Sequence, residues 1–599
     1  MSNTESAKDL HFPTPFAPVL RYPTLLLEHR IRRFAREIKE KPCWWEKVHN
    51  PDIVARWTQE IVDRDGQSVK EHWGGERLYE AFLPDPNNEN RELEKMWPRD
   101  PITDAQLRYL FDELKYHADQ RDTNTGIYPA FAQQTAIPMV YESPALIDSA
   151  LKAAIKQVAA TLENVADDQK DWHPGSNGQV LDLVHPSLYC LRIGQSFALD
   201  PRPGHSDPLR PLSVDDYFRS RLDMSEFCPE DAWGANQIGR VPYDFTVSRA
   251  YQWLPTDFAV SEDGRVAPKG YINNLNPCEH SAAYETISSV LECFLPLIER
   301  VLSDVLSPAP PSPFVGVDPG GWYNHLPQPY NWWEDTPEAE EWDRVHLWPR
   351  LPDAEPFKAQ PPEERIKFDL RGRTIQVIVK MANIVLSPES PSYPGGSWHV
   401  EGMSNEKIVA TGLYYFDSAN ITESRLAFRA AVGDGEYPGA SLLPGQQDDS
   451  KGYAVAYGLG RGEALNQELE SIVAVEDKCV AFPNVYQHRV APFALADRTR
   501  PGHRKILAFF VVDPSTHIHS TSDVPPQQAE WYRDAVYGAE RFRRLPQELV
   551  DMILEYVLES TVSLEQAKAD REALTEERVQ FVVSHNEKVF EDTFNMCEH

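Results

Sequence analysis

Short runs of β-branched and aromatic residues crowd residues 365–513 of this 599-residue chain, and they constrain its fold more than any other feature. Turn-forming residues separate the runs, a pattern typical of an antiparallel barrel or jelly roll. The expected strands are residues 374–385, 407–416, 426–432, 453–457, 471–475, 479–482 and 505–512. We therefore predict a jelly-roll core within an α+β protein.

Helical patterns flank this β-rich stretch. Before it, Ser143 and the proline that follows form an N-cap pair, and a strong helix is predicted over residues 281–306. After it, residues 546–558 are amphipathic, and Ser563 with Gln566 forms a capping box. Four regions follow: an α-rich region at 1–306, a connection rich in Pro and Trp at 307–363, the jelly-roll core at 364–523 and a helical segment at 524–599. We expect the last segment to pack on the barrel or to mediate a homodimer.

Composition limits the partners of the chain. Its formal charge of -33, from 59 basic and 92 acidic residues, argues against general binding to nucleic acid. The seven cysteines form no Cys-x-x-Cys pair, so neither a zinc ribbon nor a disulfide framework is indicated. The N-terminus lacks the pattern of a signal peptide, and the apolar run at 506–512 is far shorter than a membrane span. We expect a soluble, cytoplasmic protein that does not bind membranes.

A metal-binding pattern lies inside the β-rich stretch. His399 and Glu401 stand two residues apart just after a Pro-Gly-Gly turn, and side chains at this spacing point the same way on a strand. His488, 89 residues downstream, begins another β-rich stretch and could supply a third ligand. Two histidines and one carboxylate form the facial triad that leaves open positions on non-heme Fe(II). We predict that His399, Glu401 and His488 bind iron and form the catalytic centre.

An arginine follows the distal histidine. Arg504 stands at the start of the apolar strand predicted over 505–512, after a Pro-Gly turn. Its guanidinium could hold a carboxylate through two parallel hydrogen bonds. Arg498 and Arg500 are rivals for this role, but they lie in the preceding loop.

Several other residues are weaker candidates. Those that could touch a cosubstrate or substrate are Lys380, Asn383, Tyr393, Trp398 and Tyr414. The pair His517 and His519 is flanked by Ser and Thr, so we expect it on the surface. Cys597 and His599 are taken as incidental, and His503 as a neighbour of the pocket or an exposed turn residue.

At these residues the chain resembles the 2-oxoglutarate and Fe(II)-dependent oxygenases, whose pattern is His-x-Asp/Glu, a distal His, and an Arg or Lys on the following strand. The run Tyr-Pro-Gly-Gly-Ser-Trp-His-Val-Glu-Gly at 393–402 also resembles a family of large, mainly fungal proteins known only as a domain of unknown function. That second resemblance spans most of the chain, including the Asp-Trp-His-Pro-Gly-Ser-Asn run at 171–177 and the Tyr-Ile-Asn-Asn-Leu-Asn-Pro run at 271–277.

The resemblance implies a double-stranded β-helix, or cupin-like, core in which His399, Glu401 and His488 bind Fe(II). Arg504 would pair with the distal carboxylate of 2-oxoglutarate. Two features depart from the family pattern: glutamate replaces the commoner aspartate, and Arg504 follows His488 by 16 residues, a longer interval than usual. The implied activity is hydroxylation, desaturation, cyclisation or dealkylation of a small-molecule or amino-acid-like substrate with molecular oxygen, releasing succinate and CO2.

Two alternatives remain. A protein hydroxylase or demethylase of the Jumonji type also favours His-x-Glu, but it usually holds 2-oxoglutarate with a lysine, here Lys407. The acidity of the chain does not suit a chromatin reader. A cupin-like binding or scaffold protein without catalysis is the second alternative, and an intact triad argues against it.

Overall fold

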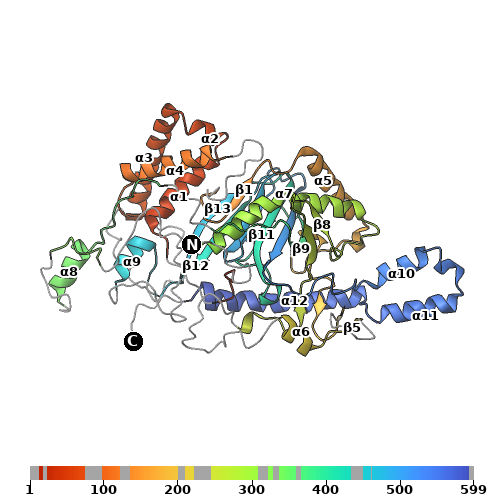
Figure 1. Ribbon diagram of the computed structural model, residues 1–599. Helices are drawn as coiled ribbons and strands as arrows, with labels where there is room; N and C mark the ends of the chain where they lie inside the picture. The colour runs from red at the N-terminus through yellow and green to blue at the C-terminus, as the bar shows by residue number, and fades with distance from the viewer. Residues whose placement is uncertain are drawn as a thin grey trace.

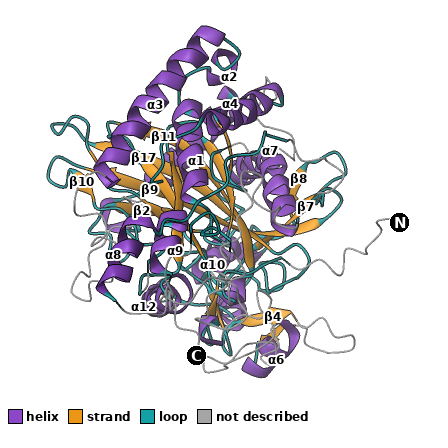
Figure 2. Cartoon of the chain, turned by 90° about the vertical axis from the view of Figure 1, so that its left-hand side faces the viewer, coloured by secondary structure: helices purple, strands orange, loops and turns teal. Residues whose placement is uncertain are grey.

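The computed structural model describes residues 12–17, 23–73, 97–121, 135–199, 209–221, 244–307, 321–327, 336–358, 366–432, 449–460 and 462–592. Within these ranges the protein is α+β. A large antiparallel sheet lies at the centre, with helices on one face and smaller sheets on the other (Figures 1 and 2).

The large sheet has the strand order β1-β14-β11-β17-β9-β7-β8, and β2 also pairs with β9. All these pairs are antiparallel. The strands are β1 (Tyr141–Ser143), β2 (Val180–Val184), β7 (Thr256–Val260), β8 (Val266–Pro268), β9 (Thr374–Leu386), β11 (Ile408–Ala419), β14 (Cys479–Pro483) and β17 (Gly502–Val512). Strands β1, β2, β7 and β8 precede residue 306, so the predicted boundary there does not separate a helical region from the sheet.

A smaller sheet faces the large one. It has the order β13-β12-β15, with β13 (Asn466–Val473), β12 (Arg425–Ala431) and β15 (Gln487–Val490). Ile378, Tyr415 and Phe510 of the large sheet share one hydrophobic cluster with Leu426 and Phe428 of β12. We call the side of the large sheet that faces β12 its inner face. Further two-stranded pairs are β10 (Ser392–Tyr393) with β16 (Phe493–Ala494), β3 (Leu191–Arg192) with β6 (Tyr251–Gln252), and β4 (Phe197–Leu199) with β5 (Leu209–Pro211).

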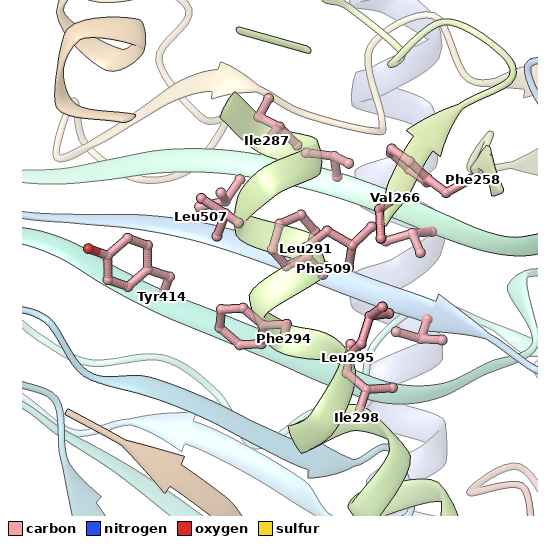
Figure 3. Packing of buried hydrophobic residues seen from close by; sticks show 14 of the residues in the cluster. Phe258, Val266, Ile287, Leu291, Phe294, Leu295, Ile298, Tyr414, Leu507 and Phe509 are labelled. Atoms are coloured by element: carbon pink, nitrogen blue, oxygen red, sulfur yellow. The ribbon is translucent and has the colours of Figure 1, made fainter. Parts of the chain in front are cut away.

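Helix α7 (Ser281–Leu306) covers the opposite, outer face of the large sheet, and it confirms the helix predicted over 281–306. Its apolar side chains recur every three or four residues, which places them on one side of the helix. Figure 3 shows Leu291 and Phe294 against Leu507 and Phe509 of β17. Each such buried side chain contributes about 1.5–3 kcal/mol to folding. Helix α5 (Ser149–Glu163) packs beside α7 on this face.

The helix predicted to start at Ser143 begins later. Ser143 belongs to β1, where it pairs with Cys479, and α5 starts after Asp148. The Asp148 carboxylate accepts a hydrogen bond from the amide of Leu151 at 2.8 Å. That bond satisfies an amide of the first turn, so Asp148 is the cap and Ser143 is not.

The N-terminal helices form a unit beside the sheets (Figure 1). They are α1 (Leu26–Lys39), α2 (Trp44–Lys47), α3 (Pro51–Trp73) and α4 (Asp104–Asp119), and they share one hydrophobic cluster. Trp322 of the Pro/Trp-rich connection is buried in that cluster, so this part of the connection packs against the N-terminal helices. Residues 453–457, predicted as a strand, instead lie in α9 (Ser450–Tyr457). Asp449 caps α9 by accepting from the amide of Gly452 at 2.8 Å.

The C-terminal helices have two different positions. Helices α10 (Ala529–Gly538) and α11 (Gln547–Leu558) form a hairpin that projects from the body, whereas α12 (Leu564–His585) lies along it (Figure 1). Ser563 caps α12 by accepting from the amide of Gln566 at 3.1 Å, as predicted, but the Gln566 side chain donates to Asp570 at 2.9 Å and does not complete the predicted capping box. The remaining helices are α6 (Val214–Arg221) and α8 (Pro337–His346). None of the helices in the described ranges combines the length and apolar character needed to cross a membrane.

Candidate metal centre

The structure brings His399, Glu401 and His488 together. One ligating atom from each residue lies within 4.8 Å of the others. Oε1 of Glu401 is 3.3 Å from Nε2 of His488 and 3.9 Å from Nε2 of His399. The three side chains therefore converge from two segments that are 89 residues apart in the sequence.

Backbone hydrogen bonds fix the two histidines relative to each other. The amide of His399 donates to the carbonyl of His488 at 3.2 Å, and the amide of His488 donates back at 3.0 Å. His488 also belongs to β15, where its cross-strand partner is Phe428 of β12. The imidazole of His488 packs on the ring of Phe482, with centroids 4.9 Å apart. These contacts leave the His488 ring little freedom to turn.

Asn484 fixes the carboxylate ligand, a role that sequence reasoning did not assign. Its Oδ1 accepts from the amide of Glu401 at 2.8 Å, and its Nδ2 donates to the carbonyls of Glu401 at 2.9 Å and Ile408 at 3.0 Å. Asn484 is fully buried. The sequence gives no signal for this role, because asparagine is also a common turn residue.

The protonation states suit a cation. Nδ1 of His399 is 2.8 Å from the carbonyl oxygen of Ser397, so the ring donates a hydrogen bond from Nδ1. The lone pair of Nε2 is then left free on the side of Glu401. Burial and the neighbouring His488 lower the pKa of His399 to about 4. Burial alone would raise the pKa of Glu401, but the hydrogen bond from His488 and the nearby His399 lower it to about 2. At neutral pH the site therefore offers a carboxylate and a neutral His399 ring.

The donor set fits a divalent transition ion. Two imidazoles and one carboxylate are the ligands of the facial triad, and they leave coordination positions open for other molecules. The side chain of His399 is 33% exposed, whereas those of Glu401 and His488 are 14% and 5% exposed. The open side of the site is therefore the side of His399.

Arg504 is a buried cation without a carboxylate partner in the described part of the chain. It is 2% exposed, and burial lowers the pKa of its guanidinium. Nη1 donates to Oγ of Ser424 at 2.6 Å, and the guanidinium lies 5.4 Å from the ring of Tyr415 and 5.3 Å from that of Phe493. Burying an unpaired charge is unfavourable by several kcal/mol. An anionic ligand at this position would remove that penalty.

The position of Arg504 relates it to the metal centre. Its hydrogen-bond partner Ser424 lies four residues before Phe428, and Phe428 is the cross-strand partner of His488 in the triad. The rival arginines differ, since Arg498 is exposed and Arg500 pairs with Asp497 at 2.9 Å in the exposed loop.

Three weaker candidates lie on different faces of the large sheet. Lys380 lies close enough to the triad for its positive charge to lower the pKa values of His399 and Glu401. Asn383, by contrast, donates to Glu163 of α5 at 2.8 Å, and Tyr414 packs with the α7 cluster on the outer face (Figure 3). The structure therefore does not bring Asn383 and Tyr414, both predicted to contact the cosubstrate, to the inner face that carries the triad. The next residue, Tyr415, is the one that points to the inner face.

The other candidates have structural contacts of their own. Tyr393 pairs with Phe493 beside Arg504. The ring of Trp398 contacts the guanidiniums of Arg429 and Arg489, whose central carbons are 5.0 Å and 4.4 Å from the ring centroid.

The other histidines considered in the sequence have contacts of their own. His503 is 3.1 Å from Asp417. His517 has a side chain 45% exposed, as expected, but His519 is buried and stacks on Tyr217, so the surface prediction for His519 is wrong. Cys597 and His599 lie outside the described residues.

A second cluster of ligand-type residues was not predicted. One ligating atom each of His173, Asp182 and His185 lies within 4.8 Å of the others. Burial alone would raise the pKa of Asp182, but His185 and the hydrogen bond from His173 lower it to about 2. Burial lowers the pKa of His185 well below its usual value. In the sequence, His173 lies in a Pro-Gly turn segment that served only for the family resemblance.

No curated protein matches the chain. Similar solved structures include IDO from Bacillus thuringiensis, with 9% identity over 23% of this chain and 46% of that one and a TM-score of 0.15. A second is the Fe(II)/(alpha)ketoglutarate-dependent dioxygenase TqaL, with 9% identity, coverage of 43% and 65% and a TM-score of 0.18. A third is a bsmA homolog from Methylobium petroleophilum PM1, with 9% identity, coverage of 62% and 88% and a TM-score of 0.21. The chain spans about half the length of the first of these and about two thirds of the second.

Family models match most of the chain. Residues 1–60 match the model described as "Domain of unknown function DUF4246, N-terminal". Residues 104–535 match the model described as "Protein of unknown function (DUF4246)", and this match covers more than half of the chain. The chain therefore belongs to the DUF4246 family.

Proposed function

We propose that this protein is a non-heme Fe(II) and 2-oxoglutarate-dependent oxygenase with a double-stranded β-helix core. One observation carries the proposal: a His399, Glu401 and His488 triad stands in the same two-sheet interior as Arg504, a buried guanidinium that has no carboxylate partner among the described residues. The triad alone fits several divalent ions. The added arginine selects a cosubstrate that has a carboxylate at one end and can reach the metal with the other.

Each residue has a distinct task in this proposal. His399, Glu401 and His488 would hold the iron, and Arg504 with Ser424 would hold the distal carboxylate of 2-oxoglutarate. Bound together, iron and 2-oxoglutarate would supply the oxidation of a substrate C–H bond by molecular oxygen, with release of succinate and CO2. Asn484 keeps Glu401 in place, and the Ser397 carbonyl keeps the proton of His399 on Nδ1.

The surroundings of the triad favour a small substrate at one side. Phe428 and Phe482 pack against the ring of His488 and exclude water from that side. His399 is the most exposed ligand, so substrate and oxygen would approach from its side. A small-molecule or amino-acid-like substrate fits this one-sided access. The substituent that reacts would lie next to the His399 ring.

Anaerobic titration of the full-length protein with Fe(II) and 2-oxoglutarate tests the proposal. We expect a weak metal-to-ligand charge-transfer band in the visible spectrum and, after air is admitted, succinate. His399→Ala and Glu401→Ala should each remove the band, whereas the matched variant His517→Ala should keep it. Absence of both the band and succinate in the wild-type protein would sink the oxygenase proposal.

A second pair of variants separates the enzyme classes. Arg504→Ala should raise the concentration of 2-oxoglutarate needed for the band, and Lys407→Ala should leave it unchanged. The reverse result would favour the Jumonji-type alternative, which holds the cosubstrate with a lysine.

A further inference from the structure

We infer that His173, Asp182 and His185 form a second divalent-metal site, separate from the iron site proposed above. His173 precedes β2, Asp182 lies in it and His185 follows it directly, and β2 pairs with β9 of the large sheet. The inference does not depend on the proposed oxygenase activity.

The geometry of the cluster is close to that of a metal site. Nδ1 of His173 is 2.8 Å from Oδ2 of Asp182, and the rings of His173 and His185 have centroids 5.0 Å apart. An ion that binds at about 2.0–2.2 Å from each ligand holds ligand atoms roughly 3–3.5 Å apart. Because the three atoms already lie within 4.8 Å of one another, a shift of about 1 Å would complete the site.

An unsatisfied oxygen points independently to a missing ligand. Asp182 is 5% exposed, and its Oδ1 has no hydrogen-bond partner among the described residues. The carboxylate accepts from His173 through Oδ2 alone. A buried carboxylate oxygen without a hydrogen-bond partner is unfavourable, because it has lost its contacts with water and gained none in the protein. A purely structural Asp–His pair gives no reason for this oxygen to stay unpaired, whereas a bound cation does.

The backbone around the cluster is fixed, as a metal site requires. The amide of His173 donates to the carbonyl of Val180 at 2.8 Å, and the amide of Asp182 donates to the carbonyl of Asp171 at 2.9 Å. Asp171 in turn forms an ion pair with Arg571 of α12 at 2.6 Å. The first two ligands therefore lie on a paired backbone that is anchored to a helix.

Both histidines must adjust when an ion binds, because His173 has to give up the Nδ1 proton that it donates to Asp182 and His185 has to break a contact of its own. The amide of Ser187 donates to Nδ1 of His185 at 3.2 Å, so the neutral ring carries its proton on Nε2. An ion needs an imidazole nitrogen without a proton, so this contact has to break before His185 can bind. At 3.2 Å it lies at the long end of hydrogen-bond distances, so it is a weak contact.

The ligand types decide the class of ion. Two imidazoles and one carboxylate suit Zn(II) and other divalent transition ions, whereas Ca(II) and Mg(II) prefer oxygen ligands. The side chain of His173 is 30% exposed, which gives the ion a route from solvent.

Lys380 is near both clusters, since its charge acts on Asp182 and His185 as well as on His399 and Glu401. The two sites therefore lie toward the same side of β9.

Metal stoichiometry of the full-length protein tests the inference without any activity assay. The protein is stripped with EDTA, equilibrated with Zn(II), desalted and analysed for zinc per chain by mass spectrometry. We expect about two equivalents in the wild type and about one in the double variant His173→Ala, Asp182→Asn. The double variant His399→Ala, Glu401→Gln should also hold about one. The control His503→Ala removes another histidine beside an aspartate and should keep both equivalents.

The outcomes separate this inference from the proposed function. One equivalent in the wild type, removed by the His399 and Glu401 changes, would overturn the second site and leave the oxygenase proposal standing. One equivalent removed only by the His173 and Asp182 changes would support the second site and contradict the iron site. If the His173 and Asp182 variant fails to fold, the number of zinc ions per wild-type chain and the variant His185→Ala still decide. One zinc per wild-type chain, together with retention of that zinc in His185→Ala, would overturn the inference.

Discussion

Replacing Asn484 with alanine tests whether the metal centre depends on the hydrogen bonds that hold Glu401. The Asn484 side chain makes three hydrogen bonds, two to the main chain of Glu401 and one to the carbonyl of Ile408. At about 1 kcal/mol each, their loss should lower the free energy of unfolding by about 3 kcal/mol. Loss of a group that orients a ligand typically lowers metal affinity roughly 10- to 100-fold. We expect both effects in Asn484→Ala.

The two effects require two measurements and a control. Urea unfolding in EDTA gives the stability of the metal-free protein, and anaerobic titration of Fe(II) at saturating 2-oxoglutarate gives the affinity. Asn420 is the matched control, because its side chain donates to the carbonyls of Asp497 and Arg500 and accepts from the amide of Asp497, outside the triad. Asn420→Ala should lose stability and keep the iron affinity. Unchanged iron affinity in Asn484→Ala, despite the expected loss of stability, would refute the positioning role.

Three further predictions follow from other contacts. Arg504→Met should raise the Kd for 2-oxoglutarate at least roughly 100-fold, because two charge-assisted hydrogen bonds are lost, while Arg500→Met should not change it in isothermal titration. Gly395→Ala should lower the free energy of unfolding by roughly 1–3 kcal/mol, because Gly395 has φ +92° and a Cβ there would lie 2.8 Å from the carbonyl oxygen of Val490. Gly396→Ala is the control: a Cβ at Gly396 would have its nearest atom 3.8 Å away, so this variant should unfold like the wild type in urea. Burial raises the pKa of Glu299 from 4.5 to about 7, so between these pH values the folded state holds a proton that the unfolded state has lost. The unfolding free energy of the wild type, relative to that of Glu299→Gln, should therefore fall as the pH rises from about 4.5 to about 7. A difference between the two proteins that stays constant with pH would contradict this prediction.

Local patterns predicted some parts of this structure and missed others for physical reasons. The helix at 281–306 and the cap at Ser563 depend on spacing within one element, and both are confirmed. Residues 453–457 were misread as a strand because a short apolar run fits a strand or a helix, and the Asp449 cap decides for the helix. The prediction named Tyr414, although Tyr415 is the tyrosine on the inner face, because β11 is buried on both faces and hydrophobicity does not reveal which side chain faces inward.

The candidate sites show the same limit. His399 and Glu401 share one short segment, so their spacing could be recognised, and His488 could be added from the order of the motifs. Asn484 acts through main-chain contacts that exist only in the folded chain. His173 was missed because its partners, Asp182 and His185, lie across a turn and beyond a strand, where no fixed spacing links them.

The composition of the large sheet bears on how the protein could be divided. A fragment starting at residue 364 would contain the proposed iron ligands but not β2 and β7, which pair with β9, or β1, which pairs with β14. Its sheet would then present unpaired strand edges to solvent, and such edges promote aggregation. The part of the chain that holds the proposed iron ligands therefore needs strands that lie more than a hundred residues earlier, and truncation studies should retain everything from β1 onward. Any rearrangement of genes that separated these segments would lose the sheet along with the site.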